Sequence, residues 1–494
     1  QTSLVLDTTV LSGKRLAEYR TWHKLNMEVL QRTANRGSVS TGYDIDNSCK
    51  FEDANDEYLT RTNASGTNRR TFTVSFWFKR TKLGGTQELW DGGVYSEATR
   101  IGFGLSSDEL WLDIGYSSRY RSSTTQQFRD TSAWYHIVWK VDTTQSTEAD
   151  RFRVYVNGAE ITDWASRQYP TQNFDTSVAS GLLARIGSYD ATYHGSSGYM
   201  AEFNYLDGLA VAPTEFGEYD DDSGIWIPKQ YTGSYPGQSA YLDFKDGANL
   251  GANAKGDDAN WTEVNLAAAD QAVDTPTNNF CTLNPVYQAQ GTKYHTVSNG
   301  GTFVTGNQSG TAWDGVAATI PLFKGKWYWE IKKNGAAAAT NMLVGVGGID
   351  EHLYNWRTLT TITTGAKLLF SYNGGFYANA EGGGFAYDDG DIISIALDQD
   401  NGGFYLRKNG AAWTNSGDPA SGSNLTGAQT TPWGTSIPAF NVANNVGGLQ
   451  LNFGGFDGFT VSSGNADANG YGNFEYAPPS GYYAICTKNL AEYG

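Results

Sequence analysis
Two stretches of the chain follow the same plan: DRFRVYVNGAEI at 150–161 and GGFYLRKNGAAW at 402–413. In each, an apolar residue recurs at every second position, which is the period of a half-buried β-strand. An Asn-Gly pair follows at once, beginning at Asn157 and at Asn409, and this pair is the strongest short-range signal for a tight β-hairpin. The repeat predicts that the chain builds the same strand and turn twice.

Short alternating runs surround the first hairpin. Many short strands need aromatic side chains and glycine-rich turns, and the chain has 59 Gly, 30 Tyr and 15 Trp but only 3 Met. Runs at this spacing indicate an antiparallel sandwich. The expected strands lie at 71–80, 100–105, 109–116, 134–142, 151–158, 182–189 and 199–211.

A second alternating region begins at KGKWYWEIKKNG (324–335), where Trp327 and Trp329 share one face that should be buried. Between the two regions we expect one strand, at 240–246, among acidic and proline-containing connections. Because 494 residues exceed what one core usually supports, we predict an all-β fold of two jelly-roll sandwiches. Further strands of the second sandwich are expected at 342–349, 367–372, 375–380, 390–410, 437–442 and 449–455.

The N-terminal segment differs from the rest of the chain. Residues 1–36 are basic, whereas the whole chain has a formal charge of −17, and a helix is expected over 14–35. We expect this segment either to dock on an acidic partner or to be a solvated helix face. The negative charge argues against nucleic acid as a partner, and no apolar run is long enough for membrane insertion.

Cysteine and histidine spacing indicates no zinc site and no disulfide framework. We expect Cys49, Cys281 and Cys486 to be buried as small apolar residues. DQDNGG (398–403) superficially suggests a calcium loop, but it lacks the bidentate glutamate and is better interpreted as a hairpin turn. We therefore expect no cofactor; a structural calcium ion is left open, without an assigned site.

Several motifs resemble known families. Residues 68–218, with FTVSFWFKR and RFRVYVNG, resemble the laminin-G-like, concanavalin-A-like lectin domain. Residues 303–456, with GKWYWEIKK and GDIISIALDQDNGGFYLRKNG, resemble a SPRY domain. Four framing segments resemble virion proteins of marine tailed bacteriophages, and this resemblance implies an appendage, fibre-like or decoration role. The framing segments are 42–62, 226–251, 274–285 and 474–490.

The expected organisation has five parts. It comprises a helical anchor segment at 1–41, a laminin-G-like sandwich at 42–223, a connecting region with one or more strands at 224–302, a SPRY-like sandwich at 303–460 and a C-terminal tail at 461–494.

Because jelly rolls also host glucanases, we searched for paired catalytic acids. In ELWLD, Glu109, Trp111 and Asp113 share one face of a strand, but tryptophan occupies the central position. Carboxylates four residues apart lie about 13 Å apart along a strand, beyond the separations of glycosidases. No nucleophile elbow, phosphate loop or His-Glu-x-x-His motif is present in the sequence. We predict that the chain is not an enzyme.

Aromatic side chains in expected loops are the candidate binding residues, because sugar rings pack on Trp and Tyr. The alternative is that these rings fill the core or contacts between domains. The candidates are Tyr116 and Tyr120 in 115–123, Tyr189 and Tyr193 in 188–199, Tyr354, Trp356 and Arg357 in 352–358, and Trp433 in 430–436.

These observations favour a non-enzymatic virion protein that displays lectin-like sandwiches for host-surface attachment. The alternatives are a dedicated receptor protein that binds host glycans and a glycan-degrading enzyme. The expected partners are other virion subunits, contacted through residues 1–36, further copies of the same chain and a host surface glycan. The expected location is the surface of a virion assembled in the host cytoplasm.

Overall fold

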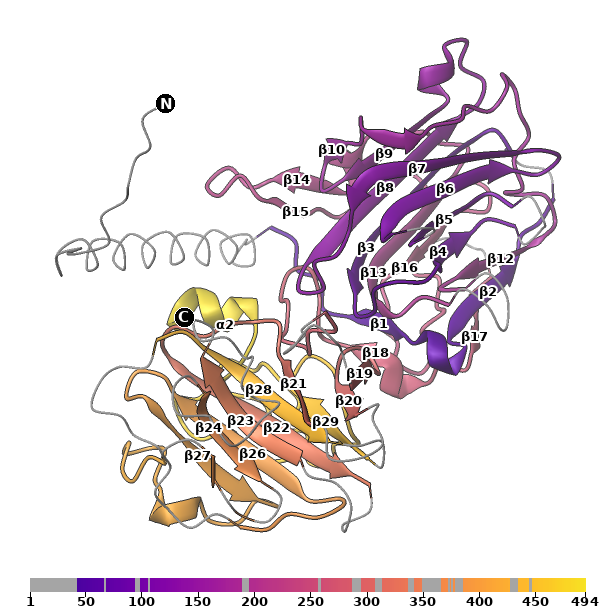
Figure 1. Ribbon diagram of the computed structural model, residues 1–494. Coiled ribbons are helices and arrows are strands. Elements are labelled where there is room, and N and C mark those ends of the chain that lie inside the picture. The colour runs from indigo at the N-terminus through magenta and orange to yellow at the C-terminus, as the bar shows by residue number, and fades with distance from the viewer. Residues whose placement is uncertain are drawn as a thin grey trace, which may run out of the picture.

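The computed structural model describes most of the chain from Gly42 onward (Figure 1). The described residues fold into two β-sandwiches, and α2 (Thr487–Tyr493) lies at the C-terminus. The all-β prediction is confirmed. The described ranges are 42–65, 68–93, 98–104, 107–188, 195–255, 259–286, 295–306, 313–335, 342–348, 366–371, 374, 376–377, 385–426, 434–443 and 447–494.

The first sandwich has two eight-stranded antiparallel sheets among the described residues. One has the order β10-β9-β8-β3-β13-β1-β18, with β16 also paired to β13, and the other the order β11-β7-β6-β5-β4-β12-β2-β17. The first sheet comprises β1 (Ser48–Phe51), β3 (Thr71–Arg80), β8 (Trp134–Asp142), β9 (Phe152–Val156), β10 (Ala159–Glu160), β13 (Gly198–Asp207), β16 (Ala240–Leu242) and β18 (Gln271–Ala272). The second comprises β2 (Tyr58–Thr62), β4 (Gln87–Asp91), β5 (Arg100–Phe103), β6 (Glu109–Gly115), β7 (Arg119–Gln127), β11 (Trp164–Ser166), β12 (Leu183–Ile186) and β17 (Thr262–Val264).

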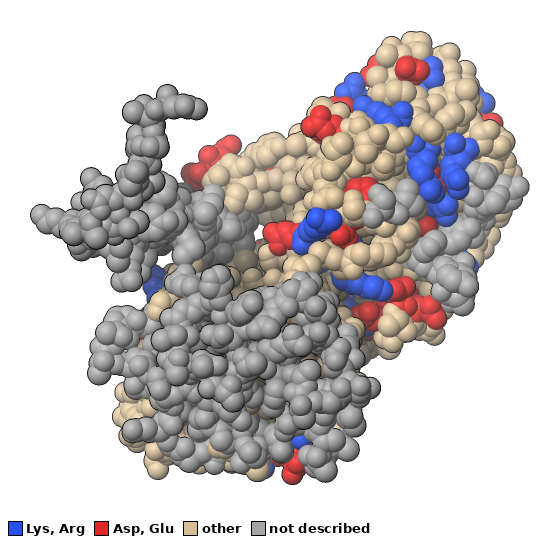
Figure 2. All heavy atoms as spheres, in the orientation of Figure 1, with Lys and Arg blue, Asp and Glu red and all other residues tan. Residues whose placement is uncertain are grey.

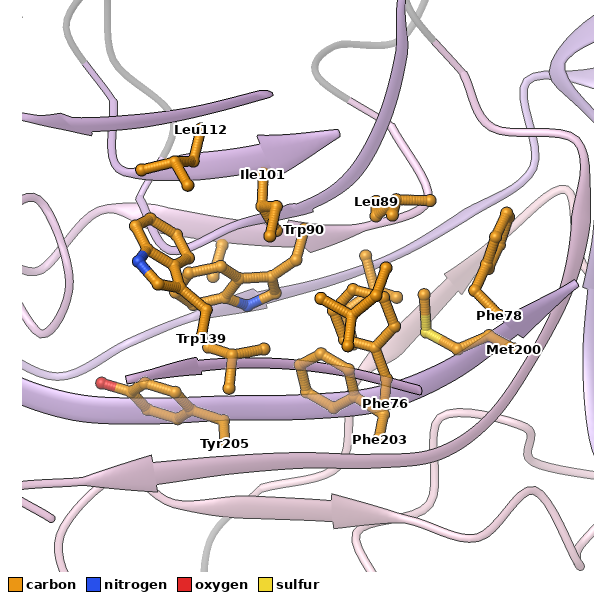
Figure 3. Packing of buried hydrophobic residues seen from close by; sticks show 14 of the residues in the cluster. Phe76, Phe78, Leu89, Trp90, Ile101, Leu112, Trp139, Met200, Phe203 and Tyr205 are labelled. Atoms are coloured by element: carbon orange, nitrogen blue, oxygen red, sulfur yellow. The ribbon is translucent and has the colours of Figure 1, made fainter. Parts of the chain in front are cut away.

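Large aromatic side chains fill the space between these two sheets (Figure 3). Trp90 of β4 meets Trp139 of β8 edge-on, with ring centroids 6.1 Å apart, and Tyr205 lies 5.8 Å from Trp90. Each of these rings is almost completely buried. Their burial follows from the alternation in the sequence, which places apolar residues on the inner face of each strand.

The second sandwich packs a seven-stranded sheet, in the order β19-β20-β29-β22-β26-β27 with β30 beside β22, on a five-stranded sheet, in the order β21-β28-β23-β24-β25. The larger sheet comprises β19 (His295–Ser298), β20 (Phe303–Gly306), β22 (Lys326–Asn334), β26 (Ile392–Asp398), β27 (Gly403–Lys408), β29 (Gly448–Asn452) and β30 (Tyr483–Ala484). The smaller comprises β21 (Trp313–Ala317), β23 (Met342–Gly348), β24 (Ala366–Ser371), β25 (Phe376–Tyr377) and β28 (Ser436–Ala443).

The two Asn-Gly turns are built in the same way. Asn157 and Asn409 have φ angles of 48° and 50°, and the glycine that follows each also has positive φ, as a type I′ turn requires. The Asn157 N–H donates to the carbonyl of His136 (2.9 Å), and its Oδ1 accepts the His136 N–H (2.8 Å). Asn409 makes the same two bonds with Ile392, each at 2.8 Å. Each asparagine therefore forms the turn and also adds two hydrogen bonds to the strand paired beside it, β8 for Asn157 and β26 for Asn409.

The structure adds strands that the sequence pattern did not predict. β7 begins inside 115–123, which we expected to be a loop; its sequence RYRSSTTQQ lacks the apolar alternation by which strands are recognised. One of the acidic connections expected between the two regions, at 218–224, lies within a hairpin of β14 (Gly217–Tyr219) and β15 (Trp226–Pro228). Strands β16, β17 and β18 of the expected connecting region pair with strands of the first sandwich.

Four other expectations concern the DQDNGG loop, the cysteines, membrane-spanning helices and the N-terminal helix. DQDNGG forms the turn between β26 and β27, so the hairpin interpretation is confirmed. The three cysteines are free and buried, as expected. Within the described ranges, none of the helices has the length and apolar character needed to cross a membrane. The helix expected at 14–35 lies outside the described residues.

A buried ion pair lies where the two sandwiches meet. Lys79 Nζ of β3 donates to Asp274 Oδ2, to Asn279 Oδ1 and to the Phe280 carbonyl, each at 2.7 Å. The other oxygen of Asp274 accepts the Trp134 indole N–H at 3.1 Å. Lys79 and Asp274 have side chains 0% and 1% exposed. Such a pair is tolerated because hydrogen bonds satisfy both charges.

The segment after Asp274 joins the second sandwich. The N–H groups of Val273 and Asp274 donate to the Gly455 carbonyl, and Phe280 packs in a cluster with Tyr328 and Phe474. Residues 273–281 therefore contact both sandwiches and connect one to the other.

Strand β22 of the second sandwich provides a stability test. Trp327 and Trp329 are fully buried in the main core, as predicted, and Tyr328 is buried on the opposite face of β22. Trp329→Ala should lower the free energy of unfolding by about 3–5 kcal/mol, because it removes a large buried ring and leaves a cavity. Urea unfolding measures the loss; a change below about 1 kcal/mol, as at exposed sites, would contradict the packing.

His136 lies between two tryptophans on the outer face of β8. Its ring stacks 4.6 Å from Trp77, and its Nδ1 accepts the Trp226 indole N–H at 2.9 Å. Because Nδ1 is the acceptor, the proton of the neutral ring is on Nε2, which lies 2.9 Å from Ser75 Oγ. Burial lowers the pKa of His136 to about 3, and protonation of Nδ1 would remove the bond from Trp226.

Stability should therefore depend on pH through His136. The unfolded chain binds a proton at this residue below about pH 6.5, whereas the folded chain does not until about pH 3. The contribution of neutral His136 to the free energy of unfolding is complete above pH 6.5. It is lost as the pH falls from 6.5 towards 3, by at most about 1.4 kcal/mol per pH unit. Urea unfolding between pH 7.5 and 5 should show a steeper loss in the wild type than in His136→Gln; equal slopes would contradict this role.

Candidate functional site
A row of alternating charge crosses the outer face of the second sheet of the first sandwich. Arg121 of β7 lies opposite Asp113 of β6, Asp113 lies opposite Arg100 of β5, Arg100 lies opposite Asp91 of β4, and Asp91 lies opposite Arg185 of β12. Residues directly opposite on neighbouring strands point to the same face. We call these five residues the charge row.

Asp113 is the centre of the strongest contacts in the charge row. Arg121 donates Nε to Oδ1 and Nη2 to Oδ2 of Asp113, both at 2.7 Å, and Arg100 Nε donates to Oδ2 at 3.1 Å. The Asp113 side chain is fully buried, whereas that of Arg121 is 30% exposed. One end of the charge row therefore reaches solvent with a guanidinium held in a fixed, bidentate geometry.

Trp111 lies beside the charge row. Its ring is 5.6 Å from the Arg100 guanidinium and 5.4 Å from that of Arg121, within the range of cation–π attraction. The indole covers Gly102 on the neighbouring strand, where a Cβ atom would lie 2.8 Å from the ring. Glycine at this position lets the ring lie flat against the sheet.

Two buried carboxyl groups, Glu88 and Asp91, lie on β4, between β5 and β12. Burial, together with the neighbouring Asp91, raises the pKa of Glu88 well above its ordinary value, and burial raises the pKa of Asp91 to about 7. Arg100 Nη1 is 3.6 Å from Glu88 Oε2, too far for a hydrogen bond. Burial and the neighbouring Asp91 therefore both disfavour the charged form of Glu88.

The acids considered for catalysis are engaged by other groups. Glu109 accepts the Ser107 N–H at 2.6 Å, and Asp113 is held by two arginines. Both residues are buried. Among the residues that the structure describes, no group of three or more His, Cys, Asp or Glu side chains could hold a metal ion.

The candidate binding residues are separated by the structure. Tyr116 lies at the turn after β6, half-buried beneath the Arg69 guanidinium at 4.1 Å. Tyr120 is on β7 and points inward, where its ring meets Phe174 edge-on at 5.2 Å. A role for these rings in binding stays a prediction. The other candidates lie outside the described residues: Tyr189, Tyr193, Tyr354, Trp356, Arg357 and Trp433.

Sequence reasoning did not find the charge row. Its members come from five strands, and β7, which carries Arg121, was not predicted as a strand. The alternation of Glu109, Trp111 and Asp113 was the one available signal, because it placed an aromatic ring and an acid on one face. The partners on neighbouring strands follow only from the register.

Comparison with known proteins agrees with this architecture. Residues 53–208 match the family model described as "Concanavalin A-like lectin/glucanases superfamily". No curated protein sequence matches the chain at the required significance. Residues 53–208 are thus similar to laminin-G-like, concanavalin A-like domains.

Solved structures with a similar fold include SPRY and carbohydrate-related proteins. The SPRY domain of human HERC1 is 18% identical, with a TM-score of 0.27, covering 34% of this chain and 96% of that one. Domain 4 of AbnA, a GH43 extracellular arabinanase from Geobacillus stearothermophilus, in complex with arabinotriose, is 20% identical, with a TM-score of 0.22 and coverages of 29% and 64%. The SAP-like pentraxin of Limulus polyphemus is 17% identical, with a TM-score of 0.25 and coverages of 35% and 80%.

The charge row predicts a large stability effect at Asp113. Asp113→Asn removes the negative charge from between Arg100 and Arg121 and leaves Arg100 buried beside the neutral amide, so stability should fall by about 3–5 kcal/mol. Asp175→Asn is the matched control, because Asp175 pairs with Arg70 at the surface, and it should change stability little. Equal effects of the two variants in urea unfolding would contradict the importance of the row.

Proposed function
We propose that the chain is a non-enzymatic carbohydrate-binding protein that displays two lectin-like sandwiches. The observation that carries this proposal is the charge row on a domain similar to concanavalin A-like lectins. Arg121, at the solvent end of the row, offers hydrogen-bond donors to a sugar, and the buried Trp111 and Asp113 hold its guanidinium in place. Because Asp113 and Glu109 are buried and engaged, they are poorly placed to act as acid and nucleophile.

The particle that carries these sandwiches is proposed to be the virion of a tailed bacteriophage. The support is the resemblance of the framing segments together with their place in the fold. Residues 274–285 contribute Asp274 and Phe280 to the contact between the sandwiches, and 474–490 contributes Phe474 to the cluster around Phe280. These segments join the sandwiches into one unit, as suits an appendage or decoration protein.

The basic segment 1–36 is the proposed contact with other virion subunits or with further copies of the chain. Its positive charge beside an acidic body favours attachment to an acidic surface. The protein would then lie on the outside of the particle, with its sandwiches directed at a host-surface glycan.

Two assays on the full chain test the function. The protein should bind selected glycans on an array and should release no reducing sugar from the glycans it binds. Retention on the array with sugar release would favour the glycan-degrading enzyme instead, whereas no binding to any glycan would contradict carbohydrate recognition. Antibodies against the chain should label purified phage particles; unlabelled particles would contradict the virion location.

A further inference from the structure
Three side chains of complementary chemistry meet where the two sandwiches join. They are the amine of Lys79 on β3, the carboxyl group of Asp274 and the side-chain amide of Asn279. Lys79 Nζ lies 2.7 Å from Asp274 Oδ2 and 2.7 Å from Asn279 Oδ1. A nucleophile is therefore within hydrogen-bond distance of both a proton acceptor and an acyl group. We call these three residues the Lys–Asp–Asn triad.

The charged members of the triad are shielded from water. Figure 2 shows charged side chains spread over one face of the first sandwich, where water solvates them; the side chains of Lys79 and Asp274, in contrast, are 0% and 1% exposed. The buried Tyr199 ring lies 5.9 Å from Lys79 Nζ, and the buried Trp134 indole donates to Asp274 Oδ1 at 3.1 Å. Because burial removes the solvation of both charges, it favours transfer of a proton from the amine to the carboxylate, which neutralises both groups.

Asn279 is held with its side-chain carbonyl towards the amine. Its Nδ2 donates to the Ser132 carbonyl at 2.7 Å, and this bond assigns the other atom, Oδ1, to Lys79. The amide carbon of Asn279, one bond from Oδ1, is thereby kept beside the nucleophile. Fixed proximity of this kind replaces the entropy that two separate reactants would lose. Asn279 is half-buried, so a small molecule released from its amide can reach solvent.

We propose that Lys79 and Asn279 react within the folded chain to form an isopeptide bond, with Asp274 as the acid and base. The buried ion pair of Lys79 and Asp274 is the arrangement that precedes this reaction. Burial raises the pKa of Asp274 above its ordinary value, although Lys79 opposes the shift, and a raised pKa suits a carboxyl group that accepts and returns protons. The inference concerns how the two sandwiches are joined and does not depend on carbohydrate binding.

The reaction is balanced without a co-reactant. Lys79 gives one proton to Asp274, and its neutral amine attacks the amide carbon, Cγ, of Asn279 as an electron pair of the C=O bond moves to Oδ1. Asp274 then passes its proton to Nδ2 and takes a second one from Nζ; the C=O bond re-forms, the Cγ–Nδ2 bond breaks, and Nδ2 leaves as ammonia. Of the protons of the Lys79 ammonium group, one remains on Asp274, one leaves in ammonia and one stays on the new amide. Both buried charges disappear.

The isopeptide bond closes a covalent loop around most of the first sandwich. Residues 79 and 279 are 200 positions apart, and the strands from β4 to β18 lie between them. A link between residues so far apart restricts the unfolded chain, as a disulfide does, and the three cysteines of this chain are free. Because residues 273–281 also contact the second sandwich, the bond ties the connection between the sandwiches covalently to β3.

Mass spectrometry of the denatured full chain tests the proposal. Release of one ammonia should lower the mass by about 17 Da relative to the sequence. Because cyclisation of a terminal glutamine or of an asparagine loses the same mass, peptide mapping must locate the link. Trypsin should leave the chain uncut after Lys79 and give residues 71–80 joined to residues 256–293. Lys50 is the internal control: it is buried beside two carboxylates, and trypsin should cut after it.

Two variants separate the roles within the triad. Asn279→Ala removes the acyl group but leaves Lys79 paired with Asp274, so the chain should fold, have its full mass and be cut after Lys79. Asp274→Asn keeps the amine and the amide but removes the acid and base, so it should reduce the cross-linked fraction by about tenfold or more. Asn260→Ala is the matched control, because Asn260 is an exposed asparagine of the same tryptic fragment; it should keep the loss of ammonia. Circular dichroism reports whether each variant is folded.

Each outcome decides one part of the proposal. A folded wild-type chain of full mass that trypsin cuts after Lys79 would overturn the cross-link. Loss of water in place of ammonia, with Lys79 joined to Asp274, would exclude Asn279 as the acyl group. Equal cross-linking in the wild type and in Asp274→Asn would contradict the role of Asp274 as acid and base. None of these results depends on glycan binding, so failure of the cross-link is distinguishable from failure of the proposed function.

Discussion
The arrangement of the two sandwiches depends on one buried ion pair. Lys79 lies at the end of β3, the central strand of the first sandwich, and Asp274 begins the segment that leads to the second. Burial raises the pKa of Asp274 above its ordinary value, although Lys79 opposes this shift. The pair is worth little unless every polar atom is satisfied, and Asn279, Phe280 and Trp134 supply the remaining bonds. The pair therefore forms only when the segment 274–280 packs on β3 and Trp134 of the first sandwich.

The charge row uses the same physical rule on a sheet face. Asp113 can be fully buried because Arg100 and Arg121 surround it, whereas burial and the neighbouring Asp91 raise the pKa of Glu88 well above its ordinary value. The cost of burying these groups would be difficult to explain by stability alone, since apolar residues fill a sheet face at lower cost. At its solvent end, the row holds the Arg121 guanidinium in a fixed orientation.

Sequence and structure agree most closely on the elements. The alternation at 71–80 and the Asn-Gly pairs predicted β3 and both Asn-Gly turns, because strand period and turn chemistry are local properties. The burial of Trp329 followed from the same alternation. β7 was missed because its side chains are polar on both faces; its place in the sheet comes from pairing with β6. Most of the candidate aromatic loops lie outside the described residues, so the structure adds nothing about them.

The sequence by itself determined an all-β chain with two sandwiches, the position of each Asn-Gly turn and the inner face of the strongly alternating strands. Only the tertiary structure decided which strands are neighbours, and therefore that Arg121, Asp113 and Arg100 form a row and that Lys79 meets Asp274. The physical reason is the distance along the chain over which each kind of interaction acts. Periodicity and turn propensity act over a few residues, whereas charge pairing across a sheet or between sandwiches depends on register and on contacts between residues far apart in the chain.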